Sequence, residues 1–279
     1  MSLRSSIQSF LTLTSALVLL FFPVTQASAV TYPDYRYVAM GDSVAAGLGL
    51  GTATTDCGRS TEAYSTAIAD YYSIRAENIA CSGAKADEGI YDEQDTASGE
   101  VIEAQLDAAF ADGTPDLITL TIGANDLRWT QFIRQCAVLR CGGSFDDVRA
   151  AAYLTDLRIE LWWTLREIER RSAGNPPLVA LSGYYQPFAG DGECSDRQGI
   201  TDNEAAWLNR QATALSNVIR SEANRQADFA LYVPADFSGH ELCSGDSWIQ
   251  TRNDPAPFHP TAAGQQALAD SFIDVFESD

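Results

Sequence analysis

Two serines in this chain follow the same pair of residues, glycine and aspartate. Gly41–Ser43 ends a buried apolar run, whereas Gly245–Ser247 follows no such run and lies beside Trp248. A serine hydroxyl becomes a useful nucleophile when a neighbouring base accepts its proton. Ligands of open α/β folds bind at the carboxyl ends of the strands, which is where the first copy is expected. We therefore predict that Ser43 is a nucleophile and that the second copy is a loop.

The chain contains only two histidines that could act as the base, His240 and His259. His259 lies just before Pro260 and the last amphipathic segment, so a loop could present it over the rim of a sheet. His240 lies near Cys243, where a solvated loop residue is the simpler interpretation. We favour His259 as the general base, with His240 as the alternative.

Two further segments offer hydrogen-bond donors to a developing oxyanion. Asn125 follows the apolar run 117–122, and a preorganised side-chain donor can contribute ~3 kcal/mol to a transition state. The adjacent Asp126 is expected to cap a helix that starts near Leu127. Gly83 could supply a backbone N–H, although an ordinary turn glycine is the simpler interpretation of this residue alone.

Together these blocks resemble the SGNH (GDSL-type) hydrolase family over essentially the whole mature chain. Ser43, Gly83, Asn125 and His259 occur in the family's order, and the chain looks most like secreted actinobacterial-type lipases and esterases with three sequential disulfides. The resemblance implies a flavodoxin-like three-layer α/β sandwich with a central parallel sheet of about five strands. It also implies an oxyanion hole made by the backbone N–H groups of Ser43 and Gly83 and by the Asn125 side chain.

The residue that orients the histidine departs from the family pattern. The family places an aspartate three residues before the histidine, but here that residue is Ala256, and Asp254 lies five residues before His259. Either a backbone carbonyl near Ala256 orients His259, giving a dyad, or Asp254 completes a triad. We favour the carbonyl, because Pro255 and Pro257 stiffen the intervening chain.

Apolar runs and helical periodicity predict an α/β fold around these residues. Buried strands are expected at 35–40, 117–122, 178–181 and 229–233, with a weaker one at 75–80. Helices are expected at 62–72, 100–110, 127–138, 155–171, 202–225 and 261–277. The irregular stretches near 83–98 and 184–202 are expected to be loops over one rim of the sheet.

The termini, cysteines and charge indicate an exported protein. Residues 1–29 have the pattern of a signal peptide cleaved after Ala29, which leaves one domain at 30–279. The six cysteines predict three disulfides, with 15 possible connectivities. The short loops favour pairing in chain order, Cys57–Cys81, Cys136–Cys141 and Cys194–Cys243. The net charge of −20 repels nucleic acid and anionic lipid headgroups at long range.

The leading hypothesis is a secreted serine esterase or lipase that hydrolyses a carboxylic ester. Its substrate is a lipid or a small molecule, and it needs no metal or organic cofactor. Deacetylation of a polysaccharide is the enzymatic alternative, and a non-catalytic extracellular binding module is the alternative from another class. We expect a monomer without stable membrane insertion. Five apolar residues near the blocks could line an acyl pocket: Leu48, Leu50, Leu127, Trp129 and Phe258. Tyr184, Tyr185 and Phe188 are expected on the same rim.

Overall fold

A parallel sheet forms the centre of the structure, a computed structural model that describes residues 35–51, 55–190 and 194–278. Its five strands are β1 (Arg36–Gly41), β2 (Arg75–Asn78), β5 (Leu117–Thr121), β6 (Leu178–Ser182) and β7 (Ala230–Val233). They lie in the order β2-β1-β5-β6-β7, and every neighbouring pair is parallel. This is the 2-1-3-4-5 order of flavodoxin-like folds. The predicted α/β class and its five strands are confirmed.

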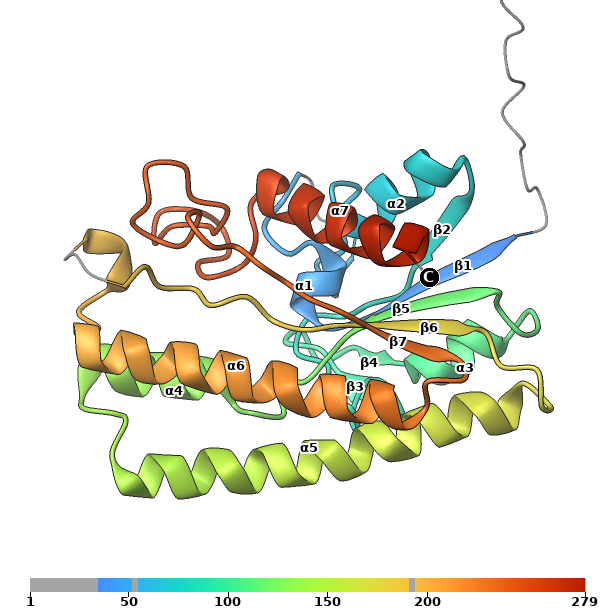
Figure 1. The fold of residues 1–279 in the computed structure, drawn as a ribbon, viewed down its shortest axis with the longest axis horizontal. Helices are drawn as coiled ribbons and strands as arrows, with labels where there is room; N and C mark the ends of the chain where they lie inside the picture. Colours follow the sequence, from blue (N-terminus) through green and yellow to red (C-terminus); the bar gives the residue numbers. More distant parts are fainter. Residues whose placement is uncertain (1–34, 52–54, 191–193, 279) are drawn as a thin grey trace, which may run out of the picture. The chain divides into compact units, whose positions relative to one another are not determined.

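Helices cover both faces of the sheet (Figure 1). One face carries α1 (Ser43–Ala46), α2 (Tyr64–Tyr72) and α7 (Ala262–Ser278). The other carries α3 (Gln105–Phe110), α4 (Trp129–Val138), α5 (Ser144–Arg171) and α6 (Asp202–Arg225). The continuous apolar runs of β1 and β5 follow from this arrangement, since strands covered on both faces bury nearly every side chain.

The structure adds short elements that the periodicity did not predict. These are α1, the two-stranded antiparallel pair β3 (Gln94–Asp95) and β4 (Val101–Ile102), and the 3₁₀ turn η1 (Ser195–Arg197). Helix α5 also begins at Ser144 rather than near residue 155. Its first turns carry the exposed side chains of Phe145 and Val148, which break the apolar spacing expected of a buried helix face.

Three disulfides join the cysteines in chain order, as predicted: Cys57–Cys81, Cys136–Cys141 and Cys194–Cys243. Within the described ranges, no helix has the length and apolar character needed to cross a bilayer. The predicted signal peptide at 1–29 lies outside the described residues.

Candidate active site

Ser43 is held at the sheet's carboxyl edge by a tight turn between β1 and α1. Gly41 has φ +137°, and a Cβ at this residue would lie 2.1 Å from the carbonyl oxygen of Thr121 on the neighbouring strand β5. The next amide, Asp42 N–H, donates to that same oxygen at 2.9 Å. Only glycine allows the first strand to approach β5 this closely and then turn, so the residue before the Asp-Ser pair fixes where the serine emerges.

Asp42 connects the serine turn to two other segments. Its carboxylate accepts a hydrogen bond from Val44 N–H at 2.9 Å and another from the Tyr184 hydroxyl. The same hydroxyl accepts from Ala124 N–H at 3.3 Å, immediately before Asn125. Burial raises the pKa of Asp42 to about 6, while the Tyr184 and Val44 hydrogen bonds oppose that rise. Tyr184 was predicted only to lie on the rim, since no local motif marks a partner 142 residues away.

His259 lies against Ser43, with 2.8 Å between its Nε2 and the serine Oγ. On the other side of the ring, Nδ1 lies 3.2 Å from the Pro257 carbonyl oxygen. The Tyr185 hydroxyl donates to the Phe258 carbonyl at 2.8 Å and so holds the loop that carries His259. Burial lowers the pKa of His259, and the carbonyls of Pro257 and Ala256 partly oppose this. The imidazole is therefore neutral and able to accept a proton at neutral pH.

Asp254 does not reach the histidine. Its carboxylate accepts hydrogen bonds from the Thr251 N–H and hydroxyl, both at 2.7 Å, on the exposed side of the loop. The Nδ1 contact is instead made by the Pro257 carbonyl, which is a backbone carbonyl near Ala256 of the kind favoured from the sequence. The geometry therefore favours the dyad arrangement.

Two of the three predicted oxyanion donors, Gly83 and Asn125, lie on loops that are joined to each other. Asn125 donates one of its two side-chain N–H bonds to the Ala84 carbonyl at 2.9 Å, and Ala86 N–H donates to Asp126 at 3.0 Å. Gly83 has φ +88°, which disfavours any side chain, and among the described residues its N–H has no acceptor. Asn125 lines the cavity beside Ser43, whereas Gly83 is exposed and is not among the residues that line it.

The cavity over Ser43 and His259 is mostly apolar. Among the five predicted acyl-pocket residues, Trp129 and Phe258 line it. The other three do not: Leu127 is fully buried in the core, and Leu48 and Leu50 lie outside the lining. Further lining residues come from α4, the loop after β6, and α6: Ile133, Tyr184, Tyr185, Pro187, Ala212 and Leu215. The α6 residues were identified from sequence only as a helix face, because periodicity does not say what that face covers.

The GDSL-like Lipase/Acylhydrolase family matches residues 39–267 of the chain. A lipase of Streptomyces rimosus is 31% identical over 276 residues, covering 95% of each chain. The crystal structure of an extracellular lipase from Streptomyces rimosus superimposes with a TM-score of 0.69 at 28% identity, covering 88% of this chain and 99% of that one. A phospholipase A1 from Streptomyces albidoflavus gives 0.60 at 25%, covering 87% and 98%.

The chain belongs to the GDSL-like Lipase/Acylhydrolase family. It is an ester hydrolase with the α/β fold of that family. The resemblance inferred from the four sequence blocks is thereby confirmed.

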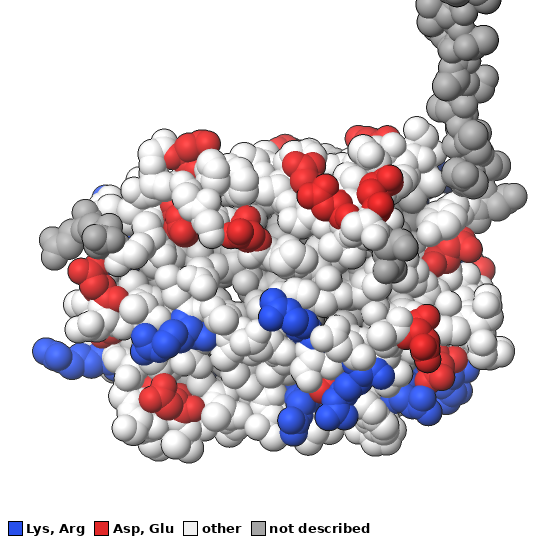
Figure 2. Space-filling model, viewed as in Figure 1, with Lys and Arg blue, Asp and Glu red and all other residues white. Residues whose placement is uncertain are grey.

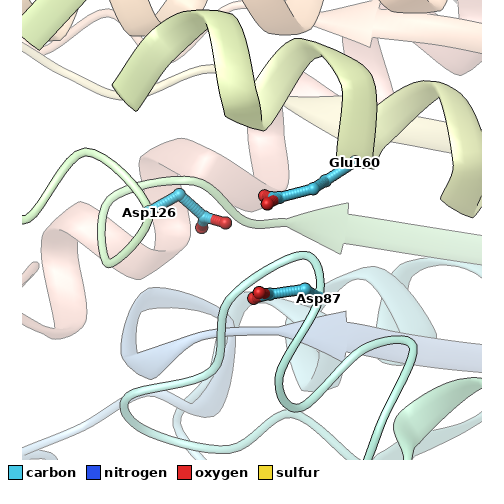
Figure 3. A group of neighbouring side chains, drawn as sticks. All are labelled: Asp87, Asp126 and Glu160. Carbon is cyan, nitrogen blue, oxygen red and sulfur yellow. The ribbon is translucent and has the colours of Figure 1, made fainter. Parts of the chain in front are cut away.

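This GDSL-type hydrolase also carries an acidic cluster beside the loops that hold Gly83 and Asn125 (Figure 3). Asp87, Asp126 and Glu160 each place one oxygen within 4.8 Å of the others. Burial is the main cause that raises the pKa of Asp126 to about 6 and of Glu160 to about 7. We interpret the cluster as a proton-sharing group beside the junction of the two loops. The expected helix cap at Asp126 is wrong, because α4 begins later, at Trp129.

The second Gly-Asp-Ser copy of the hydrolase is a loop, as predicted. Ser247 and His240 do not line the cavity. The His240 ring stacks on Trp248 instead, with ring centroids 3.7 Å apart.

Proposed function

We propose that Ser43 is the nucleophile of this hydrolase and His259 its general base. The observation that carries the proposal is the 2.8 Å contact between His259 Nε2 and Ser43 Oγ at the floor of an apolar cavity. His259 accepts the serine proton as Oγ attacks the ester carbonyl, and then returns that proton to the leaving alcohol. Water hydrolyses the acyl-enzyme by the same route in reverse.

Three donors are proposed to stabilise the oxyanion: the N–H groups of Ser43 and Gly83, and the Asn125 side chain. The first N–H of a helix has no partner within the helix, so Ser43 N–H is available to the substrate. The second N–H bond of Asn125 is available because the first is held by Ala84. Fixed donors of this kind stabilise the transition state without having to reorganise.

The proposed substrate is a carboxylic ester with an apolar acyl chain, such as a lipid. Support comes from the side chains around the dyad, which include Trp129, Ile133, Leu215 and Phe258. A similar protein is described as a phospholipase A1, which also acts on an acyl ester. An acetylated carbohydrate fits this wall less well, because sugar hydroxyls need several polar partners.

We further propose that the active form is the secreted domain 30–279 after removal of a signal peptide. The three disulfides support an oxidising compartment outside the cytosol. A monomer is the expected state, because the dyad and cavity are complete within one chain. Light scattering of the oxidised protein would test this state.

The deciding experiment is a series of p-nitrophenyl esters from acetate to palmitate, assayed with oxidised wild type, Ser43→Ala and His259→Ala. We expect activity that peaks beyond acetate and is lost in both variants. A maximum at acetate would favour the carbohydrate esterase. Wild-type activity that survives in both variants would overturn the proposed dyad.

A further inference from the structure

A group of large apolar side chains is exposed where α4 ends and α5 begins. Val138, Leu139, Phe145 and Val148 are each between 67% and 79% exposed. We call these four residues the α4–α5 tip. Single exposed apolar residues are common, but a contiguous group of them on a monomer marks an interaction surface.

The two halves of the tip are tied together by the side chain of Gln135. Its amide N–H bonds donate to the Arg140 carbonyl at 3.0 Å and to the Asp146 carboxylate at 3.1 Å. Its amide oxygen accepts from the Arg149 guanidinium at 2.9 Å. The disulfide Cys136–Cys141 closes the same junction. The four apolar side chains are therefore presented on a rigid corner rather than on a free loop.

The tip lies at the far end of α4, the helix whose first turns line the cavity. Trp129, Thr130 and Ile133 in the first turns of α4 line the cavity. Val138 lies five residues beyond Ile133, or about 8 Å along a helix. Figure 1 places this end of α4 and the start of α5 at the same side of the molecule as the loops that follow β6 and β7. Lipid at the tip would therefore be close to the cavity.

The acidic charge of the molecule is concentrated away from the tip, so an anionic lipid surface can approach the tip. Residues 128–225 hold twelve arginines and twelve acidic residues, so this range is neutral and the whole net charge of −20 lies outside it. Figure 2 shows basic and acidic side chains interspersed over the α5 and α6 side and mainly acidic ones over the opposite side. Arg134 and Arg140 are exposed beside the tip, and neither forms a salt bridge with any described residue.

We propose that the α4–α5 tip is the surface on which this hydrolase adsorbs to a lipid–water interface with anionic headgroups. The inference rests on the proposed lipid-ester function and names where that substrate is met. The four apolar side chains enter the boundary between headgroups and acyl chains, and Arg134 and Arg140 face the anionic headgroups. The acidic remainder of the surface is repelled, which orients the cavity toward the membrane.

Binding is tested without hydrolysis by using the full, oxidised chain with Ser43→Ala. Sedimentation would measure partitioning onto vesicles of phosphatidylcholine alone and of phosphatidylcholine with 30% phosphatidylglycerol. We expect tighter binding to the anionic vesicles, and about a tenfold or greater loss when Val138, Leu139 and Phe145 are all replaced by Ser. The matched control replaces Tyr71 and Val101, which are 59% and 57% exposed elsewhere, by Ser. It should bind like the parent.

A second variant does not touch the apolar residues and guards against misfolding. Arg134→Gln with Arg140→Gln should weaken binding to anionic vesicles about fivefold or more and leave binding to neutral ones unchanged. Equal binding by the parent and the triple serine variant, or equal loss in the control, would overturn the proposal. So would no effect of the arginine pair.

Kinetics separate this proposal from the proposed function. With Ser43 restored, the triple serine variant should hydrolyse soluble p-nitrophenyl butyrate within about twofold of wild type and phospholipid vesicles about tenfold more slowly. A wild type inert on both substrates would overturn the proposed function, while the vesicle-binding result would still decide the role of the tip.

Discussion

Gly-Asp-Ser occurs twice in this chain, and each copy has a histidine near it in the structure: His259 near the first and His240 near the second. In the first, Ser43 Oγ lies 2.8 Å from His259 Nε2. In the second, the Ser247 hydroxyl donates to the Ile249 carbonyl at 3.0 Å, and His240 stacks on Trp248. The hydroxyl of the second copy is thus occupied in closing its own turn. The same three residues thus supply the proposed nucleophile in one place and form an ordinary loop in the other.

The glycines and aspartates of the two copies also differ in their surroundings and in their burial. Gly41 is pressed against the Thr121 carbonyl, whereas a Cβ on Gly245 would meet nothing within 4 Å. Asp42 is only 1% exposed and holds two donors, while the side chain of Asp246 is 81% exposed. The difference arises from β1 and its pairing with β5, which bury the first copy and direct its serine to the sheet edge. The strand that precedes the short motif therefore decides whether its serine is placed at the edge of the sheet.

The serines provide the largest test of this comparison. Ser43→Ala should reduce kcat/KM on a soluble ester by ~10⁴-fold or more, because the proposed nucleophile is lost. Ser247→Ala should leave it within about twofold, since that hydroxyl only closes a turn. Labelling with diethyl p-nitrophenyl phosphate and peptide mass spectrometry should find one adduct, on Ser43. An adduct on Ser247 would refute the assignment.

The glycines give the next largest effect. Gly41→Ala should lower the free energy of unfolding by ~3 kcal/mol or more, because a Cβ would overlap backbone that cannot move without breaking the β1–β5 pairing. Gly245→Ala should change it by less than ~0.5 kcal/mol, since that residue is exposed and has open space around it. Urea denaturation with the disulfides intact measures both values. Comparable losses in the two variants would remove the distinction between the turns.

Removing the tyrosine hydroxyl that donates to Asp42 should have a smaller effect on activity. Tyr184→Phe removes a donor from the buried Asp42 carboxylate and an acceptor from Ala124 N–H, so kcat should fall about tenfold with little change in KM. Because the Tyr184 hydrogen bond lowers the pKa of Asp42, its loss should raise that pKa and move the acid limb of kcat to higher pH.

The control for Tyr184 is Tyr71→Phe, which changes an exposed ring. It should leave both kcat and its pH profile unchanged. A Tyr184→Phe variant with reduced stability but an unmoved pH profile would show that the tyrosine serves packing alone.

Much of this arrangement could be predicted from sequence, because local patterns determine it. The apolar runs located four strands of the central sheet, the weaker segment at 75–80 located β2, and helix α6 spans the predicted 202–225. The two Gly-Asp-Ser copies could be distinguished because only one follows such a run. The four proposed site residues remain predictions about chemistry, although Ser43 and His259 are in contact.

Contacts between distant segments could not be predicted. The hydrogen bond from Tyr184 to Asp42 and the lining of the cavity by Leu215 depend on how β6 and α6 pack against the rest of the fold. Leu127 is a candidate pocket residue from its place after Asn125 in the sequence, but the fold buries it completely in the core. The sequence also concealed the start of α5, whose apolar side chains point into solvent.

The two histidines give the smallest expected effect, a shift in the pH dependence of kcat/KM. They also differ in an unexpected way in their carboxylate partners. His240 has a carboxylate oxygen of Asp246 3.4 Å from its Nδ1, as a triad histidine would, yet it does not line the cavity over Ser43. His259 has the serine but only the Pro257 carbonyl at Nδ1. Burial without a carboxylate lowers the pKa of His259, so the acid limb of kcat/KM should lie below pH 6.5.

Asp254→Asn tests whether a carboxylate affects the position of the acid limb in the pH profile of kcat/KM. Since Asp254 is engaged by Thr251, its neutralisation should shift the limb by less than about 0.3 pH units and change kcat/KM by less than about twofold. A carboxylate that stabilised the imidazolium would instead hold the limb above pH 6.5, and its removal would lower it. Profiles of wild type and Asp254→Asn on one soluble ester therefore separate a dyad from a triad, and a downward shift in the variant would favour the triad.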